Sequence, residues 1–220
     1  MATKPLLADL VALYKAQAPS VQVHVESVGG VDAAKRVQAG EAFDAVVLAS
    51  DAIDKLIASG HVLPGSRVDL VHSGVAVAVP AGAPVPDIAT QEALRQAVLS
   101  ARSVGLSTGP SGAQLSRLFE RWGIADQIKG RIVQAQPGVP VGALVAQGQV
   151  ALGFQQLSEM LGVPGITIVG GLPQAVQITT TFSGSVAATS QHPDAVRALL
   201  AFCASPACAE TKRRHGMDAA

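Results

Sequence analysis

The sequence predicts an α/β protein with mainly parallel sheets. Segments with strand periodicity alternate with segments of helical periodicity along most of the 220 residues, and this order is typical of βα units. Hydrophobic residues make up 49% of the chain and charged residues 15%. This composition allows a large core and excludes disorder other than at the two ends.

The first half begins on a helix. Thr3 is a candidate N-cap, Pro5 follows in the first turn, and an apolar stripe runs on to Tyr14. Val21, Val23 and Val25 alternate with polar residues, which predicts a half-buried strand. The elements expected next are a helix after Gly29-Gly30, a strand at 43–49, a helix at 51–60, a strand at 70–79, a loop at 81–89 and a helix at 90–100.

The second half continues the alternation. A short strand at 104–106 breaks into six small residues at 107–112, and an amphipathic helix follows through Trp122. The remaining elements are strands at 131–134, 150–154, 166–169 and 176–182, and helices at 141–147, 192–206 and 206–216. Because a βαβ fold usually begins on a strand, we expect a strand ahead of the first helix to be missing from this chain.

Charge and cysteine content exclude several classes of protein. Sixteen basic and sixteen acidic residues give a net charge of zero, which argues against a nucleic-acid partner. No apolar run approaches the ~18 residues of a membrane-spanning helix, and the N-terminus shows no signal-peptide pattern. Cys203 and Cys208 have a spacing poorly suited to zinc; they fit two buried thiols, or a local disulfide in an oxidising compartment. We expect no metal and no cofactor.

The small residues at 107–112 have three interpretations. A Walker phosphate loop needs a lysine after its last glycine, and Ala113 and Gln114 stand there. A nucleophile elbow fits the strand-to-helix context, but Asp194 and His215, its available partners, lie in a helix first turn and a charged helix end. The third interpretation is a helix N-terminus that binds an anion through its unpaired backbone amides.

Three helix starts have the build of such an anion site. Each combines small residues with backbone N–H groups and the positive end of a helix dipole. They are Ala2-Thr3-Lys4, Gly29-Gly30-Val31 and Ser111-Gly112-Ala113. Small residues at a helix start are also ordinary caps, so the argument rests on three occurring together in a chain with no other chemistry.

The chain resembles the type II periplasmic substrate-binding proteins, and most closely their molybdate-binding-protein-like group. The resemblance lies in the block VQAGEAFDAVVLASDAIDKL, in the block VGALVAQGQVALGF with the later GLP turn, and in the ending ALLAFCASPACAETKRRHGM. It implies two α/β domains, 1–75 with 177–220 and 76–176, joined by two hinge crossovers and closing on a ligand bound between them. The family begins with a strand ahead of the first helix.

The resemblance also implies ligand-binding positions. Molybdate binders of the group offer serine at the first two helix starts and a later tyrosine, whereas this chain has no hydroxyl at Gly29-Gly30-Val31 and its only tyrosine is Tyr14. A small carboxylate or phosphorylated acid therefore suits the chain as well as an oxyanion does. The candidate ligand residues are Thr3, Lys4, Gly29, Gly30, Val31, Ser73, Ser111, Gly112, Ala113, Gln155 and Thr180.

Two functions remain open at this point. The first is a monomeric periplasmic protein that captures a small anion without catalysis and passes it to the membrane permease of an ABC transporter. The second is an isomerase on the same scaffold, because relatives of this group include an aconitate isomerase. Isomerisation needs a base that removes a proton from carbon, and the candidates are Lys4 and His72.

Overall fold

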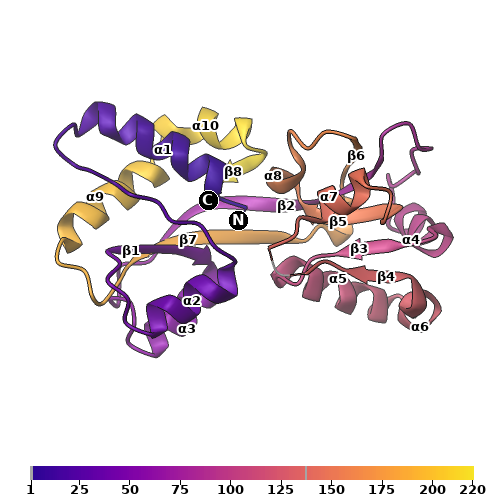
Figure 1. Cartoon of the computed structure of the whole chain (residues 1–220), viewed down its shortest axis with the longest axis horizontal. Helices are drawn as coiled ribbons and strands as arrows, with labels where there is room; N and C mark the ends of the chain where they lie inside the picture. The colour runs from indigo at the N-terminus through magenta and orange to yellow at the C-terminus, as the bar shows by residue number, and fades with distance from the viewer. Residues whose placement is uncertain (1, 137) are drawn as a thin grey trace. The chain divides into compact units, whose positions relative to one another are not determined.

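The computed structural model describes residues 2–136 and 138–220 (Figure 1). The chain forms two compact units. The first unit runs up to Ser73 and includes Thr180–Ala220, and the second is Gly74–Thr179. The boundaries therefore fall at 73/74 and 179/180, where the sequence predicts 75/76 and 176/177.

The first unit has strand order β1-β7-β2, with β8 also paired to β2. β1 (Ala45–Ala49) and β7 (Thr179–Val186) are antiparallel, with Ala45 opposite Val186. β2 (Val68–Pro80) continues into the second unit, and β8 (Met217–Ala219) pairs with its first half. The helices are α1 (Lys4–Gln17), α2 (Gly30–Gln38), α3 (Ser50–Ala58), α9 (Pro193–Ala204) and α10 (Ala209–Arg214), with a 3-10 turn at Pro206–Cys208.

The helices of the first unit form two groups. α1 packs against α9 and α10, while α2 packs against α3 and β1. Figure 1 shows α1 and α10 on one side of β1 and β7, and α2 and α3 on the other. Each group covers its own apolar cluster: Leu6, Leu10 and Leu200 belong to one, and Ile53 and Leu56 belong to the other.

The second unit contains the parallel part of the fold. β3 (Val104–Leu106) lies parallel to β4 (Ile132–Gln134) and to β5 (Leu152–Gln156). β5 and β6 (Ile166–Gly171) pair antiparallel with β2. The helices are α4 (Gln91–Ser100), α5 (Pro110–Arg121), α6 (Ala125–Ile128), α7 (Val141–Ala146) and α8 (Leu157–Met160), with 3-10 turns at Lys129–Arg131 and Gln174–Val176.

The α/β class is confirmed, but the strand directions differ in part from the prediction. β3 pairs parallel with its two neighbours, and β2 pairs antiparallel with β5, β6 and β8. The sheet is therefore mixed. The reason is that β2 is 13 residues long and serves both units, whereas βα alternation predicts direction only for strands joined by a local helical crossover.

The strand predicted at Val21, Val23 and Val25 is wrong for this structure. Residues 21–29 form neither helix nor strand, and the Val25 side chain is 43% exposed. A strand is defined by hydrogen bonds to a neighbour, and this segment pairs with no described strand. The alternation of valines is therefore present without the pairing that it requires.

Within the described residues, no helix is both long enough and apolar enough to cross a bilayer.

Candidate functional site

The start of α1 brings together several hydrogen-bond donors. Thr3 occupies the N-cap position in a helical backbone conformation, and its hydroxyl makes no capping hydrogen bond. Thr90 shows the usual alternative, since its Oγ1 accepts a hydrogen bond from the Ala93 amide at 3.1 Å. Lys4 is exposed in the first turn, which contains no acidic residue. The first-turn amides of α1, one hydroxyl and one ammonium group therefore lie close together in sequence.

The start of α2 suits an anion less well than the sequence suggests. Gly29 is the N-cap, and Gly30 and Val31 follow with Val31 67% exposed. Asp32 also lies in the first turn, and its Oδ2 is 3.5 Å from the position of a Cβ on Gly29. That carboxylate already interacts favourably with the helix dipole and would repel a second anion.

The start of α5 is built around Ser111 and Gly112. Ser111 is 4% exposed, and its Oγ lies 3.3 Å from Ser107 Oγ. A Cβ on Gly112 would collide with the backbone carbonyl of Ser107. The glycine is thus required for the loop to pack on the helix, and the predicted reason, close approach of a ligand, is not needed to explain it. Ala113 is exposed, and the first turn contains no acidic residue.

Gln134 is a part of this loop that the sequence does not single out. It ends β4, and its Nε2 donates a hydrogen bond of 2.8 Å to the Ser107 carbonyl. The same carbonyl faces Gly112, so Gln134 and Gly112 together fix the loop that leads into α5. A polar residue at the end of the parallel strand next to β3 is the signal that could have identified it.

Gln155 has a structural role. Its Oε1 accepts a hydrogen bond from the Gly142 amide at 3.1 Å, and its Nε2 donates one to Glu159 Oε2 at 3.0 Å. The side chain is 3% exposed. Because both ends of the amide already have partners inside the second unit, the structure does not support the predicted use of Gln155 as a ligand donor.

The remaining candidates lie on β2 and β7. Ser73 is fully buried and Thr180 is 7% exposed, and each has an interaction partner. His72 lies next to Ser73, and its Nδ1 is 3.0 Å from Thr181 Oγ1. This bond fixes the orientation of the imidazole ring and leaves Nε2 as the nitrogen that could exchange a proton with another group.

Charge is paired in most places near these strands. Asp69 accepts hydrogen bonds from Arg67 and from the buried Ser183, and both lower the pKa of its carboxyl group. Among the described residues, no group of three His, Cys, Asp or Glu side chains could hold a metal ion.

A family model described as bacterial extracellular solute-binding protein matches residues 1–218. The chain belongs to this family. Family membership confirms the resemblance to substrate-binding proteins drawn from the sequence, and the match covers both units.

The chain is also similar to individual proteins of known sequence or structure. It is 45% identical over 185 residues to an aconitate isomerase from Pseudomonas sp, covering 83% of this chain and 70% of that protein. The periplasmic molybdate-binding protein of Azotobacter vinelandii superposes with a TM-score of 0.78 at 18% identity, covering 98% and 94% of the two chains. L-phospholactate-bound PEB3 gives a TM-score of 0.75 at 16% identity, covering 99% and 96%. The structural likeness confirms the fold.

Proposed function

We propose that this solute-binding protein captures a small anion at a helix start, for which the first turn of α1 in the first unit and the first turn of α5 in the second unit are each a candidate. In this proposal it works as a periplasmic monomer and delivers the anion to the membrane permease of an ABC transporter, with no nucleic-acid partner. Family membership supports the solute-binding role. The relatives named above are associated with molybdate, phospholactate and aconitate, all of which are anions.

One observation carries the proposal. Among the described helices of at least eight residues, α2, α3, α4 and α9 each have an acidic side chain in the first turn, and α1 and α5 do not. An acidic first turn stabilises a helix by interaction with its dipole. Its absence leaves the positive end of the dipole and the unpaired amides available to an external anion.

Lys4 strengthens this assignment. A cation in the first turn of a helix opposes the dipole and reduces helix stability, and Lys4 is exposed with no ion pair among the described residues. A bound carboxylate would supply the missing counter-charge and would accept hydrogen bonds from Thr3 and the first-turn amides. We therefore favour a carboxylate-bearing ligand.

Calorimetric titration with citrate, cis-aconitate, trans-aconitate, L-phospholactate, molybdate and phosphate tests the proposal. We expect a carboxylate to bind, and its affinity to fall at least about tenfold in Lys4→Ala or in Ser111→Ala, which corresponds to about 1.4 kcal/mol. Lys129→Ala is the control for lost charge. If no anion on the panel binds, or if both variants bind as the parent does, the proposal is wrong.

The relative named aconitate isomerase supports a second candidate, the interconversion of cis- and trans-aconitate. This reaction moves a double bond, so a base must take a proton from one carbon and an acid must return a proton to another. His72 is the better placed of the two candidates, because the hydrogen bond to Thr181 holds its ring and leaves Nε2 for proton transfer. Lys4 would then bind substrate carboxylate.

Proton NMR of either aconitate isomer in deuterated buffer separates the two candidates. Catalysis would produce the other isomer with deuterium on carbon, at a rate that falls at least about a hundredfold in His72→Gln. A pure binding protein would bind aconitate in the calorimeter and leave both isomers unchanged. Binding without turnover therefore supports the first candidate and excludes the second.

A further inference from the structure

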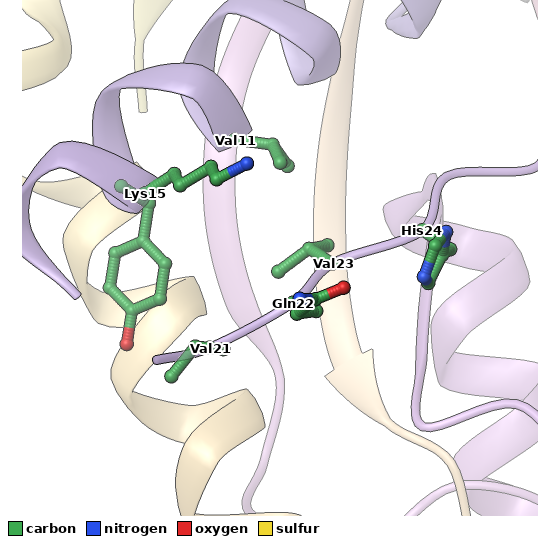
Figure 2. A pocket seen from close by; sticks show the side chains of 7 residues that line it. Val11, Lys15, Val21, Gln22, Val23 and His24 are labelled. Carbon is green, nitrogen blue, oxygen red and sulfur yellow. The ribbon is translucent and has the colours of Figure 1, made fainter. Parts of the chain in front are cut away.

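Lys212 is a buried cation without an acidic partner. It lies in α10 of the first unit, its side chain is 1% exposed, and it forms no ion pair among the described residues. Lys15 shows the usual arrangement in the same unit, because it is exposed and extends along a groove beside Val11 (Figure 2). A charge removed from water is costly unless an opposite charge compensates it. Lys212 would therefore be stabilised by a negative charge placed beside it.

The acidic residues of the surrounding helices do not supply that charge. α10 packs against α1, and α1 packs against α9. Each acidic side chain of these three helices pairs with a basic one: Asp9 with His215, Asp194 with Arg197, and Glu210 with Arg213. The groups that interact electrostatically with Lys212 are instead the thiols of Cys208 and Cys203. These two groups become negative when they lose their protons.

The two thiols lie together in the apolar cluster that contains Leu6 of α1. Cys203 is in the last turn of α9 and Cys208 ends the 3-10 turn that follows, and they are 2% and 0% exposed. Cys208 Sγ is 3.3 Å from the carbonyl oxygen of Phe202, which belongs to the same peptide group as the Cys203 amide. The Cys208 thiol therefore lies next to the backbone of Cys203. Lys212 follows Cys208 by four residues, which is the spacing of neighbours on one helix face.

We propose that Cys203 and Cys208 bind one soft monovalent metal cation, Cu(I), and that the Lys212 ammonium group is the counter-charge of the complex. Thiolate sulfur is a ligand that selects Cu(I). The metal replaces two thiol protons, so two thiols and one Cu(I) give a bis-thiolate complex of charge −1 and two released protons. Lys212 neutralises that charge, and the complex supplies the negative charge that Lys212 lacks.

Two ligands suffice for this cation, because monovalent ions with a filled d shell form linear complexes with two thiolates. Zinc requires four ligands, and no group of three His, Cys, Asp or Glu side chains in the described part of the chain could hold a metal ion. The spacing that is poorly suited to zinc is therefore compatible with Cu(I). This site uses no residue of the α1 or α5 starts, so it is independent of the proposed anion site.

Competition with the Cu(I) chelator bicinchoninate tests the proposal on the whole chain. The titration is done without oxygen, after both thiols have been reduced and their free state has been confirmed by mass spectrometry. We expect the parent protein to withdraw one Cu(I) per chain from the coloured chelator complex. Cys203→Ser and Cys208→Ser should each lower the affinity at least about a hundredfold, because each removes one ligand. Failure of the reduced parent to withdraw Cu(I) overturns the proposal.

Lys212→Met tests the counter-charge and removes no ligand. Without metal this variant should be more stable than the parent, since it buries no ammonium group, yet it should bind Cu(I) at least about tenfold more weakly. Lys15→Met removes the same charge from an exposed position of the same unit and should bind Cu(I) as the parent does. Unchanged affinity in Lys212→Met, or an equal loss in Lys15→Met, overturns the proposal. If a serine variant does not fold, this pair of variants still decides the result.

Discussion

The backbone carbonyl of Ser107 occupies the space that a Cβ on residue 112 would need. The contact joins the loop after β3 to the first turn of α5, and Gln134 Nε2 donates a hydrogen bond to the same carbonyl. The start of α5 is thus a packed structure whose shape depends on one glycine and one glutamine, although its small residues resemble a flexible loop in the sequence.

Replacing Gly112 by alanine should therefore reduce stability. The added methyl group meets backbone, which cannot move aside as a flexible side chain can, and we expect a loss of about 1–3 kcal/mol in the free energy of unfolding. Urea unfolding measures it. Gly130→Ala is the matched control, because a Cβ at Gly130 meets nothing within 4 Å. Equal effects of the two substitutions would show that the Ser107 contact is relieved at little cost.

Lys4→Glu should change stability and anion affinity in opposite directions. A carboxylate in the first turn of α1 interacts favourably with the helix dipole, so stability should rise by about 0.3 kcal/mol or more, whereas a bound anion would be repelled. Lys15→Glu makes the same charge change in the last turn of α1, where it should lower stability and leave affinity within about twofold. Melting curves and calorimetry on both variants check this pair. Loss of affinity in both would mean that net charge, and not the helix start, controls binding.

Gln155→Leu should weaken the second unit without acting on the ligand. It leaves the Gly142 amide, which now donates to Gln155 Oε1, without its acceptor, and an unsatisfied buried amide costs about 1–3 kcal/mol. Unfolding by urea measures the loss, and anion titration below the melting temperature measures affinity. A tenfold drop in affinity at unchanged stability would restore Gln155 to the ligand set.

Lys212→Met should stabilise the protein at neutral pH. The Lys212 side chain is 1% exposed, and burial lowers its pKa from 10.5. Between that lowered pKa and 10.5 the unfolded chain binds more protons than the folded chain, so the stability of the parent protein rises with pH. We expect the variant to be more stable by at least about 1 kcal/mol at pH 7, with the difference shrinking as pH approaches 10.5.

The neighbouring thiols add a pH dependence of their own that is coupled to Lys212. Burial, followed by the proximity of Cys208, raises the pKa of Cys203 to about 12, against a lowering by Lys212. The raised pKa lowers stability above the ordinary thiol pKa, and it does so more in the variant, which lacks the ammonium group; this makes the difference shrink further with rising pH. Thermal unfolding of both proteins from pH 7 to pH 10.5 provides the data. A constant difference across this range would show that Lys212 does not titrate differently on folding.

Most elements follow from the sequence because their signals are local. The stripe ending at Trp122, the glycine at 60 and the apolar run at 104–106 each report the conformation of their own few residues. Strand partners are not local. The valines of 21–25 alternate as a strand does, yet no strand adjoins them in the structure, and the antiparallel direction of β2 depends on its passage through both units.

For the candidate site, too, the sequence predicts local features and does not predict long-range contacts. Helix starts with small residues can be found by reading the sequence, and the first turns of α1 and α5 contain no acidic residue, which keeps them as candidates for an anion site. The hydrogen-bond partners and contacts of individual side chains cannot be predicted in that way. The Gln155 side chain is hydrogen-bonded to Gly142 and Glu159, and the Asp32 carboxylate lies near Gly29. These contacts depend on how the elements pack. The position of Gln134 at the end of a strand could have drawn attention to it, but its contact with Ser107, 27 residues away, could not be predicted from the sequence.

The most direct test of the central claim is a calorimetric titration of trans-aconitate and citrate into the parent protein, Lys4→Glu and Lys15→Glu. The account predicts binding of at least one of these carboxylates to the parent, retention of that binding in Lys15→Glu, and its loss by at least about tenfold, or 1.4 kcal/mol, in Lys4→Glu. Binding that is unchanged in Lys4→Glu, or no binding to the parent, would contradict the assignment of the α1 start as an anion site.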